Sequence, residues 1–528
     1  MYIFGFRIGG KKEMKREIIV NAETLETRVA ILENGKLEEF MIEHPTEERI
    51  VGSIYQGRVQ SLGEGLRAAF IDIGLAKNAF IHYWDMIPED AGRLEVEEGG
   101  GRSSSRRKDT SHEEISRRFP VGSKITVQVT KGPIGTKGPR VTANLSIPGR
   151  YLVMLPGSQL KGISKKIADG AERQRLKKAL ARLPVPENTG LILRTVAEDI
   201  SQRSIARDMR SLIATWHELQ RRMQEGTVPG CVYEEPDLVD RVVRDWMTED
   251  VDRIVVDSPE KFEQIRKIAS AFGRRVRSRI QKYDGDAPIF SHFDVERQLE
   301  ESLRRKVVLK SGGYIVLDET EALIAIDVNT GRHKSRSQDD VIFEVNMEAV
   351  EEVARQLRLR NIGGLVMIDL IDMTSRKHQN TVYKAFKDAL RRDKARTNVL
   401  PISKLGILEM SRQRVEESII TAMHVDCPYC SGLGRIKSPL TMSVEIQRHI
   451  QAVVRKHRGS SQPLKLQIIV NPTVLERLKE EDEEVLVELQ SKLAGHLTFK
   501  ANPGLHHEAF SIINADTNEV MASVERQH

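Results

Sequence analysis

Cysteine is scarce in this chain, whose 528 residues include only Cys231, Cys427 and Cys430. Three cysteines exclude a disulfide framework, so the close pair needs another explanation, and the lone Cys231 is interpreted as a small buried hydrophobe. The sequence also lacks any run of about 18 apolar residues, and no apolar signal core follows the basic residues near its N-terminus. These absences predict a cytoplasmic protein without a membrane span.

Charge of one sign is not in large excess either. Lysine and arginine number 82 against 76 acidic residues, a net charge of +6 that does not by itself indicate a nucleic-acid binder. Cations do cluster at 266–282 and 391–396, and each cluster is either a solvated helix face or a nucleic-acid contact. With 39% hydrophobic residues, the chain can form several cores, and we expect roughly three to five domains.

Short strand patterns dominate the first part of the sequence. Residues 1–13 fit no pattern and form an N-terminal extension, whereas residues 14–50 alternate apolar and polar side chains around an Asn-Gly hairpin signal at 34–35. Between 51 and 145, five short strands punctuated by glycine favour a small OB-type barrel. A polar stretch at 95–118 interrupts these strands and is interpreted as a disordered insertion.

Two predicted strands on either side of a helix carry carboxylates at their ends. The first, at 321–329, ends with Asp327 and Asn329, and the second passes through Asp369 to Asp372. The helix between them has apolar residues at helical spacing, so it must pack on a sheet. A strand, a helix and a strand in this order form a right-handed crossover with parallel strands. Asp327 and Asp369 should therefore both emerge at the carboxyl edge, on strands that can be adjacent.

Carboxylate and amide oxygens gathered at one edge are the ligands that magnesium prefers. A magnesium ion at Asp327 and Asp369 would polarise a phosphodiester and lower the pKa of a bound water. Two alternatives remain open at this point. Strand-end aspartates also cap helices or turns, and Asp372 fits the ligand role as well as Asp369 does.

The close pair of cysteines, Cys427 and Cys430, is followed by Ser-Gly-Leu-Gly, which is typical of half a zinc-knuckle-like site. A structural zinc ion takes four ligands, and the sequence contains no second pair. Either His424 and another residue complete the site, or two subunits each give a pair and share the ion. A redox dithiol is the third interpretation, although the strand-to-helix junction that usually carries one is not evident.

Four stretches resemble a known family, namely AIDVNTGR, ARQLRLRNIGGLVMIDLIDM, ILEMSRQR and CPYCSGLG, in this order. At this spacing they are similar to the catalytic half of RNase E/G ribonucleases. Upstream, GRYLVMLPG, GISKKI and GLILRT extend the resemblance, which covers residue 14 to the C-terminus. The sequence has no long Arg- and Pro-rich tail, which favours the shorter branch of that family.

The resemblance implies a multidomain α/β fold. An RNase H-like subdomain is split by the barrel, and a 5′ sensor, a DNase I-like catalytic subdomain, a zinc-link and a small C-terminal α/β domain complete the chain. The last of these, a dimerisation domain, contains a long acidic helix predicted at 471–493. The implied boundaries are 14–50 and 241–303 for the RNase H-like parts, 51–145 for the RNA-binding barrel, 146–240 for the sensor, 304–423 for the catalytic subdomain, 424–437 for the zinc-link and 438–528 for the small domain.

The resemblance also assigns roles to single residues. It implies that Asp327 and Asp369, rather than Asp372, are the magnesium ligands, and that Asn329 assists Asp327. Aromatic rings beside a cation suit the stacking of single-stranded bases. The RNA-contacting positions of the barrel are Phe70, Phe80 and Lys137.

The family's sensor for a 5′-monophosphate falls on Arg194 and Thr195, beside backbone at Gly149 and Val153. A guanidinium grips phosphate through two hydrogen bonds, and a hydroxyl adds a donor. At the position of one supporting arginine of the family pattern, this sequence has Lys165. A lysine keeps the positive charge but lacks the guanidinium that forms two parallel hydrogen bonds to a phosphate. Without the resemblance, Arg194 is an ordinary strand-end charge, and the two barrel phenylalanines are core residues.

The implied function is a magnesium-dependent endoribonuclease that cleaves single-stranded RNA and is stimulated by a 5′-monophosphate. Its implied substrates are ribosomal RNA precursors, in 5′-end maturation, and messenger RNA, in decay. Its implied partners are further copies of the chain, in a homodimer or tetramer that shares zinc. A non-catalytic RNA-binding protein would need the barrel but not the paired carboxylates, and a two-metal DNA nuclease would need the carboxylates but not a stacking barrel.

Overall fold

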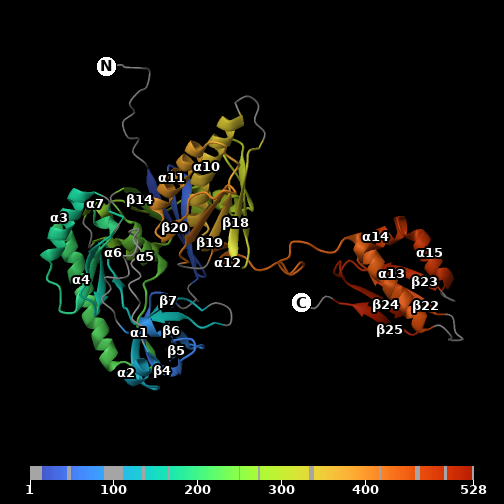
Figure 1. Cartoon of the computed structure of the whole chain (residues 1–528), viewed down its shortest axis with the longest axis horizontal. Helices are drawn as coiled ribbons and strands as arrows, with labels where there is room; N and C mark the ends of the chain where they lie inside the picture. The colour runs from blue at the N-terminus through green and yellow to red at the C-terminus, as the bar shows by residue number, and fades with distance from the viewer. Residues whose placement is uncertain are drawn as a thin grey trace, which may run out of the picture. The chain divides into compact units, whose positions relative to one another are not determined.

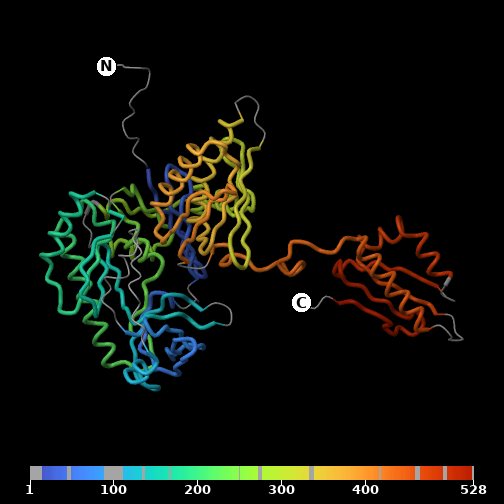
Figure 2. The backbone as a smooth tube through the Cα atoms, viewed as in Figure 1, coloured from blue at the N-terminus to red at the C-terminus, as the bar shows by residue number. Residues whose placement is uncertain are grey.

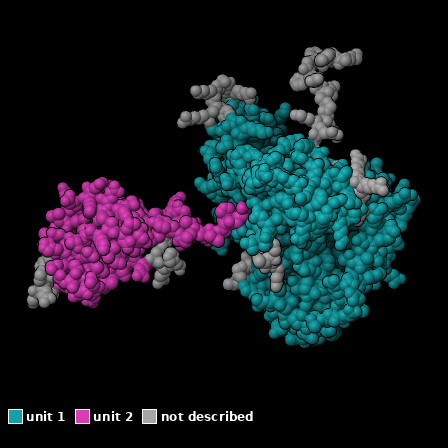
Figure 3. Space-filling model, turned by 180° about the vertical axis from the view of Figure 1, so that it is seen from behind, with its two compact units in different colours: residues 1–422 teal, residues 423–528 magenta. Residues whose placement is uncertain are grey.

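The chain divides into two compact units, residues 1–422 and 423–528, which Figure 3 shows in different colours. None of the helices among the described residues is long and apolar enough to cross a membrane. The computed structural model describes residues 15–44, 49–87, 111–133, 137–164, 166–167, 169–248, 250–270, 274–331, 338–414, 418–457, 464–492 and 496–525.

The segments on either side of the barrel share one sheet of order β15-β14-β1-β2-β3. Figures 1 and 2 show its N-terminal strands in dark blue. The predicted hairpin is confirmed, because β2 and β3 are joined by Asn34 and Gly35, both with the positive φ that a type I′ turn requires. Helices α5 and α6 cover one face, and α8, α9 and the end of α10 cover the other. The bounds are β1 Arg16–Ala22, β2 Thr27–Glu33, β3 Lys36–Glu43, β14 Val251–Val256, β15 Ile280–Lys282, α5 Leu238–Trp246, α6 Pro259–Ser270, α7 Arg274–Arg277, α8 Ile289–His292 and α9 Val295–Leu303.

The five predicted strands between residues 51 and 145 form a closed barrel of order β4-β5-β6-β8-β7, because β4 also pairs with β7. Small and branched side chains such as Ala69, Ile71 and Val127 fill its interior. Gly57 allows the close packing, since a Cβ there would lie 2.6 Å from the Asp72 carbonyl oxygen. The bounds are β4 Ile54–Gly63, β5 Ala68–Asp72, β6 Ala79–His82, α1 Tyr83–Met86, β7 Lys124–Lys131 and β8 Arg140–Thr142, and β13 Gly230–Tyr233 pairs with β4.

The predicted disordered insertion at 95–118 is wrong at its end. Its residues up to 110 lie outside the described ranges, but His112–Arg118 form helix α2. The Ser111 hydroxyl accepts a hydrogen bond from the Glu114 amide at 3.2 Å, and Ile115 is fully buried in the barrel core. A serine three residues before a glutamate is a capping signal that the polar composition of the loop obscured.

Residues 147–225 form a four-stranded sheet of order β11-β12-β10-β9. The long amphipathic helix α4 buries Ile205, Met209 and Leu212 in the same core as β10 and β12. The bounds are β9 Ile147–Pro148, β10 Leu152–Pro156, β11 Lys161–Ile163, α3 Gly170–Ala181, β12 Thr189–Leu193, η2 Thr195–Ala197 and α4 Gln202–Glu225.

The last part of the first unit is a six-stranded sheet of order β16-β17-β18-β19-β21-β20. The predicted crossover is confirmed, because α10 connects β18 to β19 and these two strands pair in parallel. Alternate residues such as Ile326 and Ile368 are buried with α10 and α11, whereas the opposite face exposes residues such as Leu365. The bounds are β16 Lys306–Val308, β17 Tyr314–Glu319, β18 Leu323–Asn329, α10 Gln338–Leu359, β19 Gly364–Asp369, α11 Arg376–Ala389, η3 Leu390–Arg392, β20 Thr397–Val399, β21 Ile407–Arg412 and α12 Ile419–Met423.

The second unit contains a sheet of order β23-β22-β24-β25, which packs with α13 and α14 around one core. The predicted single helix at 471–493 is wrong, since two helices break at Glu481 and Asp482. The Asp482 carboxylate accepts a hydrogen bond from the Ser443 hydroxyl at 2.6 Å, a tertiary contact that fixes the break. The bounds are α13 Pro439–Lys456, β22 Lys465–Val470, α14 Pro472–Glu480, α15 Glu483–Lys492, β23 His496–Ala501, β24 Phe510–Asn514 and β25 Val520–Val524.

Candidate active site and nucleic-acid interface

The two candidate carboxylates lie side by side at the carboxyl edge of the six-stranded sheet. Asp327 on β18 and Asp369 on β19 are direct partners in the parallel register, and both are exposed. The predicted meeting of these residues on adjacent strands is therefore confirmed, while their metal-binding role stays a prediction. Because neighbouring strands are about 4.8 Å apart, two ionised carboxylates here repel each other unless a cation offsets their charge.

The surroundings of this pair fit a hard divalent cation. The Asn329 side-chain amide donates a hydrogen bond to Asp327 Oδ2 at 2.8 Å and orients that carboxylate. The described residues contain no group of three or more His, Cys, Asp or Glu side chains that could hold a metal. Asp327 and Asp369 would thus supply two ligands, and magnesium commonly completes its shell with water and phosphate oxygens.

Asp372 lies beyond the end of β19, in a different setting from the carboxylate pair. It lines a hollow of about 240 Å³ together with Met373, Gln379 and Lys404. The loop that carries it is held by Asn346, which is fully buried within α10 and exchanges hydrogen bonds of 2.8 and 3.1 Å with the Ile371 backbone. Sequence reasoning missed Asn346, although a polar residue inside an apolar helical stripe was a signal for such a contact.

The predicted sensor residues come together from neighbouring strands and turns. Arg194 Nη1 donates to the Gly149 carbonyl oxygen at 2.7 Å and to Asp245 Oδ1 at 2.6 Å. Thr195 follows directly in η2, and Val153 lies on β10, which pairs with the strand that leads to Arg194. Lys165 lies outside the described residues.

Gly149 is required at its position by a close approach. A Cβ there would lie 2.8 Å from Asp208 Oδ2. The Asp208 carboxylate accepts backbone hydrogen bonds from Arg150, Tyr151 and Leu152 at 2.8 to 3.1 Å. This carboxylate fixes the turn against which Arg194 is placed, and the sequence pattern gave no sign of it.

In the cationic cluster at 391–396, Arg391 and Arg392 are exposed on the short helix η3, whereas Lys394 packs against an aromatic ring. Lys394 is exposed as a residue, but its ammonium lies 3.2 Å from the centre of the Trp246 ring. Loss of hydration there lowers the pKa of Lys394 to about 7, against the attraction of Glu39 and Asp245. Burial opposes ionisation of Asp245, but Arg194 and Arg244 hold its pKa below the ordinary value.

A second contact links the segment that carries the predicted sensor residues to the same loop. Lys166 Nζ donates to the Asp393 carbonyl oxygen at 2.6 Å, and the Asp393 carboxylate binds Arg412 of β21 at 2.7 Å. Both Asp393 and Arg412 are buried, and β21 pairs with the strand that carries Asp369. Residues 146–240 and the six-stranded sheet are thus joined within the first unit by a half-buried contact from Lys166 and by the buried pair of Asp393 and Arg412.

Glu39 gives this junction a pH dependence that can be measured. Burial raises the pKa of Glu39 to about 7 from 4.5, against the attraction of Lys394 and Arg358. The folded protein is destabilised by the free energy needed to ionise buried Glu39. This destabilisation is absent below about pH 4.5 and complete above about pH 7.

We expect the Glu39→Gln variant to unfold at nearly the wild-type temperature at about pH 4.5. At about pH 8 its free energy of unfolding should exceed that of wild type by on the order of 1–3 kcal/mol. Thermal denaturation at both pH values tests this, with exposed Glu64→Gln as the charge control, and a pH-independent difference would contradict it.

The barrel carries an aromatic ladder on its outer surface. Phe70 and Phe80 are half-buried and pair across β5 and β6 with ring centres 5.9 Å apart, while their strand neighbours fill the interior. Their interpretation as core residues is therefore wrong, because strand alternation turns them outward. Sequence reasoning missed His82 and Trp84, which extend the ladder with rings stacked at 4.0 Å. Exposed Lys137 lies close to β6, since the nearby Pro139 carbonyl oxygen accepts from the Phe80 amide at 2.8 Å.

Neither member of the cysteine pair is in a disulfide, and Cys427 is exposed while Cys430 is half-buried. The Gly434 amide donates a hydrogen bond to Cys430 Sγ at 3.2 Å. Ser431, Gly432 and Gly434 all have positive φ, which folds the chain back over the sulfur. Cys231 is exposed on β13, not buried as predicted, because strand alternation places Val232 inward instead.

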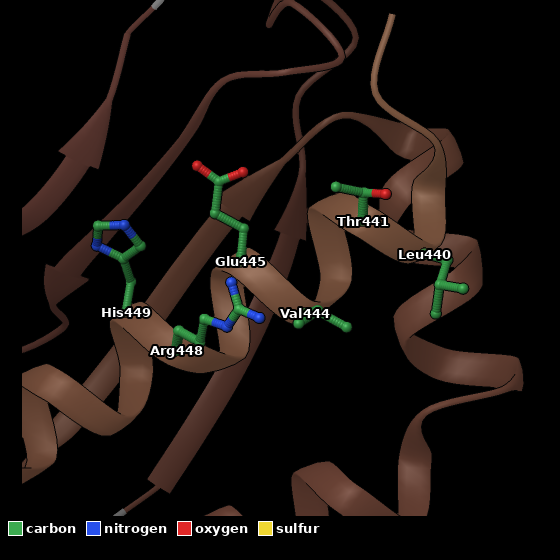
Figure 4. Close-up of a pocket in the computed structure, with 6 residues that line it drawn as sticks. All are labelled: Leu440, Thr441, Val444, Glu445, Arg448 and His449. Atoms are coloured by element: carbon green, nitrogen blue, oxygen red, sulfur yellow. The ribbon is translucent and has the colours of Figure 1, made fainter.

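A hollow of about 470 Å³ lies along α13 in the second unit (Figure 4). It contains no paired carboxylates and no thiol, so its composition does not suggest catalysis. Leu440 and Val444 are partly exposed on this face. The lining residues are Leu440, Thr441, Val444, Glu445, Arg448 and His449.

Comparisons with known proteins agree with this arrangement. Residues 146–415 match the Ribonuclease E/G family. The chain is 38% identical to ribonuclease G of Escherichia coli K12 over 95% of this chain and 100% of that protein. It is 35% identical to ribonuclease G of Haemophilus influenzae over 94% and 99%. It is 36% identical to ribonuclease E of E. coli K12 over 83% of this chain but 40% of that protein. The chain therefore belongs to the ribonuclease E/G family of endoribonucleases.

Proposed function

We propose that this endoribonuclease cleaves single-stranded RNA with a magnesium ion held by Asp327 and Asp369. The observation that carries the proposal is the direct pairing of these exposed carboxylates across two parallel strands. When bound, magnesium supplies a Lewis acid for the phosphodiester and lowers the pKa of a coordinated water. Asp327 and Asp369 hold the ion, and Asn329 keeps Asp327 in the orientation that binding needs.

The barrel is the proposed binding surface for the RNA strand. Phe70 and Phe80 are half-buried on the outer side of β5 and β6, and Lys137 is exposed near β6. Stacking on such rings accepts any base sequence. Together with the sheet order, this supports the finer assignment of an OB-type barrel between two RNase H-like segments, a sensor at 146–240 and a DNase I-like subdomain at 304–423. In this proposal the cellular substrates are ribosomal RNA precursors and messenger RNA, as the family relationship suggests.

Arg194 is the proposed ligand of a 5′-monophosphate, with Thr195, Gly149 and Val153 around it and Lys165 as a supporting charge. Its Nη1 is occupied by Gly149 and Asp245, which fixes the plane of the guanidinium. Among the described residues, Nε and Nη2 of Arg194 have no hydrogen-bond partner. These two nitrogens are therefore available to donate hydrogen bonds to a phosphate.

Arg194→Ala should reduce the preference for 5′-monophosphorylated over 5′-hydroxyl RNA, on the order of tenfold, because a charge-assisted contact is lost. The ratio of kcat/KM on the two substrates measures this effect. Activity on 5′-hydroxyl RNA should be kept, and Arg210→Ala, an exposed arginine on α4, is the matched control. An unchanged ratio would contradict the sensor assignment.

The proposed oligomer is a homodimer or tetramer in which Cys427 and Cys430 of two chains share one zinc ion. Support comes from the closeness in sequence of two cysteines that form no disulfide and from the Gly434 amide that donates to Cys430 Sγ. The partly exposed Leu440 and Val444 on α13 support a role of 438–528 in self-association.

The decisive experiment is cleavage of one short labelled single-stranded RNA, with and without magnesium, by wild type and by Asp327→Asn. Cutting by wild type only, and only with magnesium, is the expected outcome. A DNA strand of the same sequence separates a ribonuclease from a nuclease without sugar preference. Cutting that does not need magnesium would contradict the metal mechanism.

A further inference from the structure

The open face of the catalytic sheet continues beyond the carboxylate pair toward its edge strand. Lys306 on β16 pairs with Val316 on β17, and Val316 pairs with Asp327. Directly paired residues of neighbouring strands point to the same face. Lys306 therefore lies in one row with Asp327 and Asp369, while Val307 and Ile315 turn into the core beneath the helices. With strands about 4.8 Å apart, the Lys306 backbone is about 10 Å from that of Asp327.

The Lys306 ammonium has a defined position on this face. It lies 3.6 Å from the centre of the half-buried Tyr314 ring. Tyr314 pairs directly with Asn329, the residue whose amide orients Asp327. The ring thus holds a flexible side chain beside the metal row by a cation–π contact.

The charge on Lys306 is not neutralised by the protein. Among the described residues, no carboxylate forms an ion pair with Lys306, which is exposed. The preceding residue differs in this respect, because Arg305 binds Asp318 through two hydrogen bonds. Two neighbouring cations thus differ in whether their charge is available to a ligand.

We propose that Lys306, held by Tyr314, binds an RNA phosphate next to the one that is cleaved. The proposal rests on the proposed function, since it takes Asp327 and Asp369 as the site of cleavage. An anionic strand crossing the open face would be attracted to the unpaired ammonium, and the ion pair would fix the register of the strand over the carboxylates. Lys306 is a substrate-binding residue in this scheme, and Tyr314 is its positioning residue.

The test measures RNA binding and cleavage by Lys306→Met in the full-length protein. Affinity for a labelled single-stranded RNA, measured in EDTA over a range of salt concentrations, should fall about threefold to tenfold. The slope of log affinity against log salt should decrease by about 0.7, the value for one lost phosphate contact on a single strand. With magnesium, KM should rise while kcat is largely kept, because a ground-state contact is lost.

Three variants make the result specific. Lys306→Arg should retain the salt slope, Tyr314→Leu should weaken binding less than Lys306→Met does, and Arg305→Met should behave as wild type. An unchanged slope in Lys306→Met, or an equal loss in Arg305→Met, would overturn the subsite. A wild-type protein that binds RNA but does not cut it with magnesium would instead overturn the proposed function, and the binding measurements would still decide the subsite.

Discussion

Asp327→Asn or Asp369→Asn is expected to abolish magnesium-dependent cleavage, lowering kcat/KM on the order of 10³-fold or more. Each change replaces an anionic oxygen ligand by a neutral amide of almost the same shape. The sheet should remain folded, because both side chains are exposed and their strand neighbours form the core. Cleavage of a short labelled RNA at several magnesium concentrations measures the effect.

The matched control is Asp372→Asn, which removes a carboxylate from the same segment but from the hollow beyond the strand end. It should keep most of the activity, and all three variants should bind single-stranded RNA like wild type. Near-normal cleavage by both Asp327→Asn and Asp369→Asn would disprove the catalytic assignment. An inactive Asp372→Asn beside an active Asp369→Asn would transfer the ligand role to Asp372.

The second large effect is expected from replacing Cys427 and Cys430 together with serine. Two thiolates give half of the four ligands that a structural zinc takes, so an ion shared by two chains would hold the oligomer together. The double variant should lose zinc and shift toward monomer. Activity should also fall if catalysis requires RNA to be held by one chain and cut by the other.

Metal analysis and light scattering on the same samples measure this prediction. Wild type should contain one zinc ion per two chains, and Cys231→Ser should match it, because that thiol lies on the barrel edge. One zinc ion per chain would rule out the shared site. In that case, loss of zinc from a His424→Ala variant would identify His424 as a ligand within one chain.

Local patterns in the sequence predicted several features that the structure confirms. The five barrel strands, the hairpin at Asn34 and Gly35, and the crossover that pairs Asp327 with Asp369 all follow from short-range periodicity. These patterns are legible because alternation in strands and the apolar stripe of a helix are set by which face is buried. The metal-binding and RNA-binding roles of these residues stay predictions.

The predictions that were wrong relied on the composition or periodicity of a segment alone and took no account of the residues that pack against it. The loop end at 112–118 is polar but forms a capped helix, because Ile115 has a core to enter. The acidic stretch after residue 471 has helical periodicity throughout, yet it breaks where Asp482 meets Ser443 of another helix. Phe70 and Phe80 are apolar but point outward, a choice that alternation alone leaves open until the inner face is known.

The sequence was therefore sufficient for the strands of the barrel and for the two carboxylates that face each other, since both depend on local spacing along the chain. It could not reveal the residues that hold the candidate site residues in position. Asp208 and Asp245 beside Arg194, Asn346 behind the loop after β19, and Trp246 beneath Lys394 are contacts between residues far apart in the chain. Such polar contacts are selected by the packing of whole elements against one another, and no local periodicity encodes which partner a buried charge will meet.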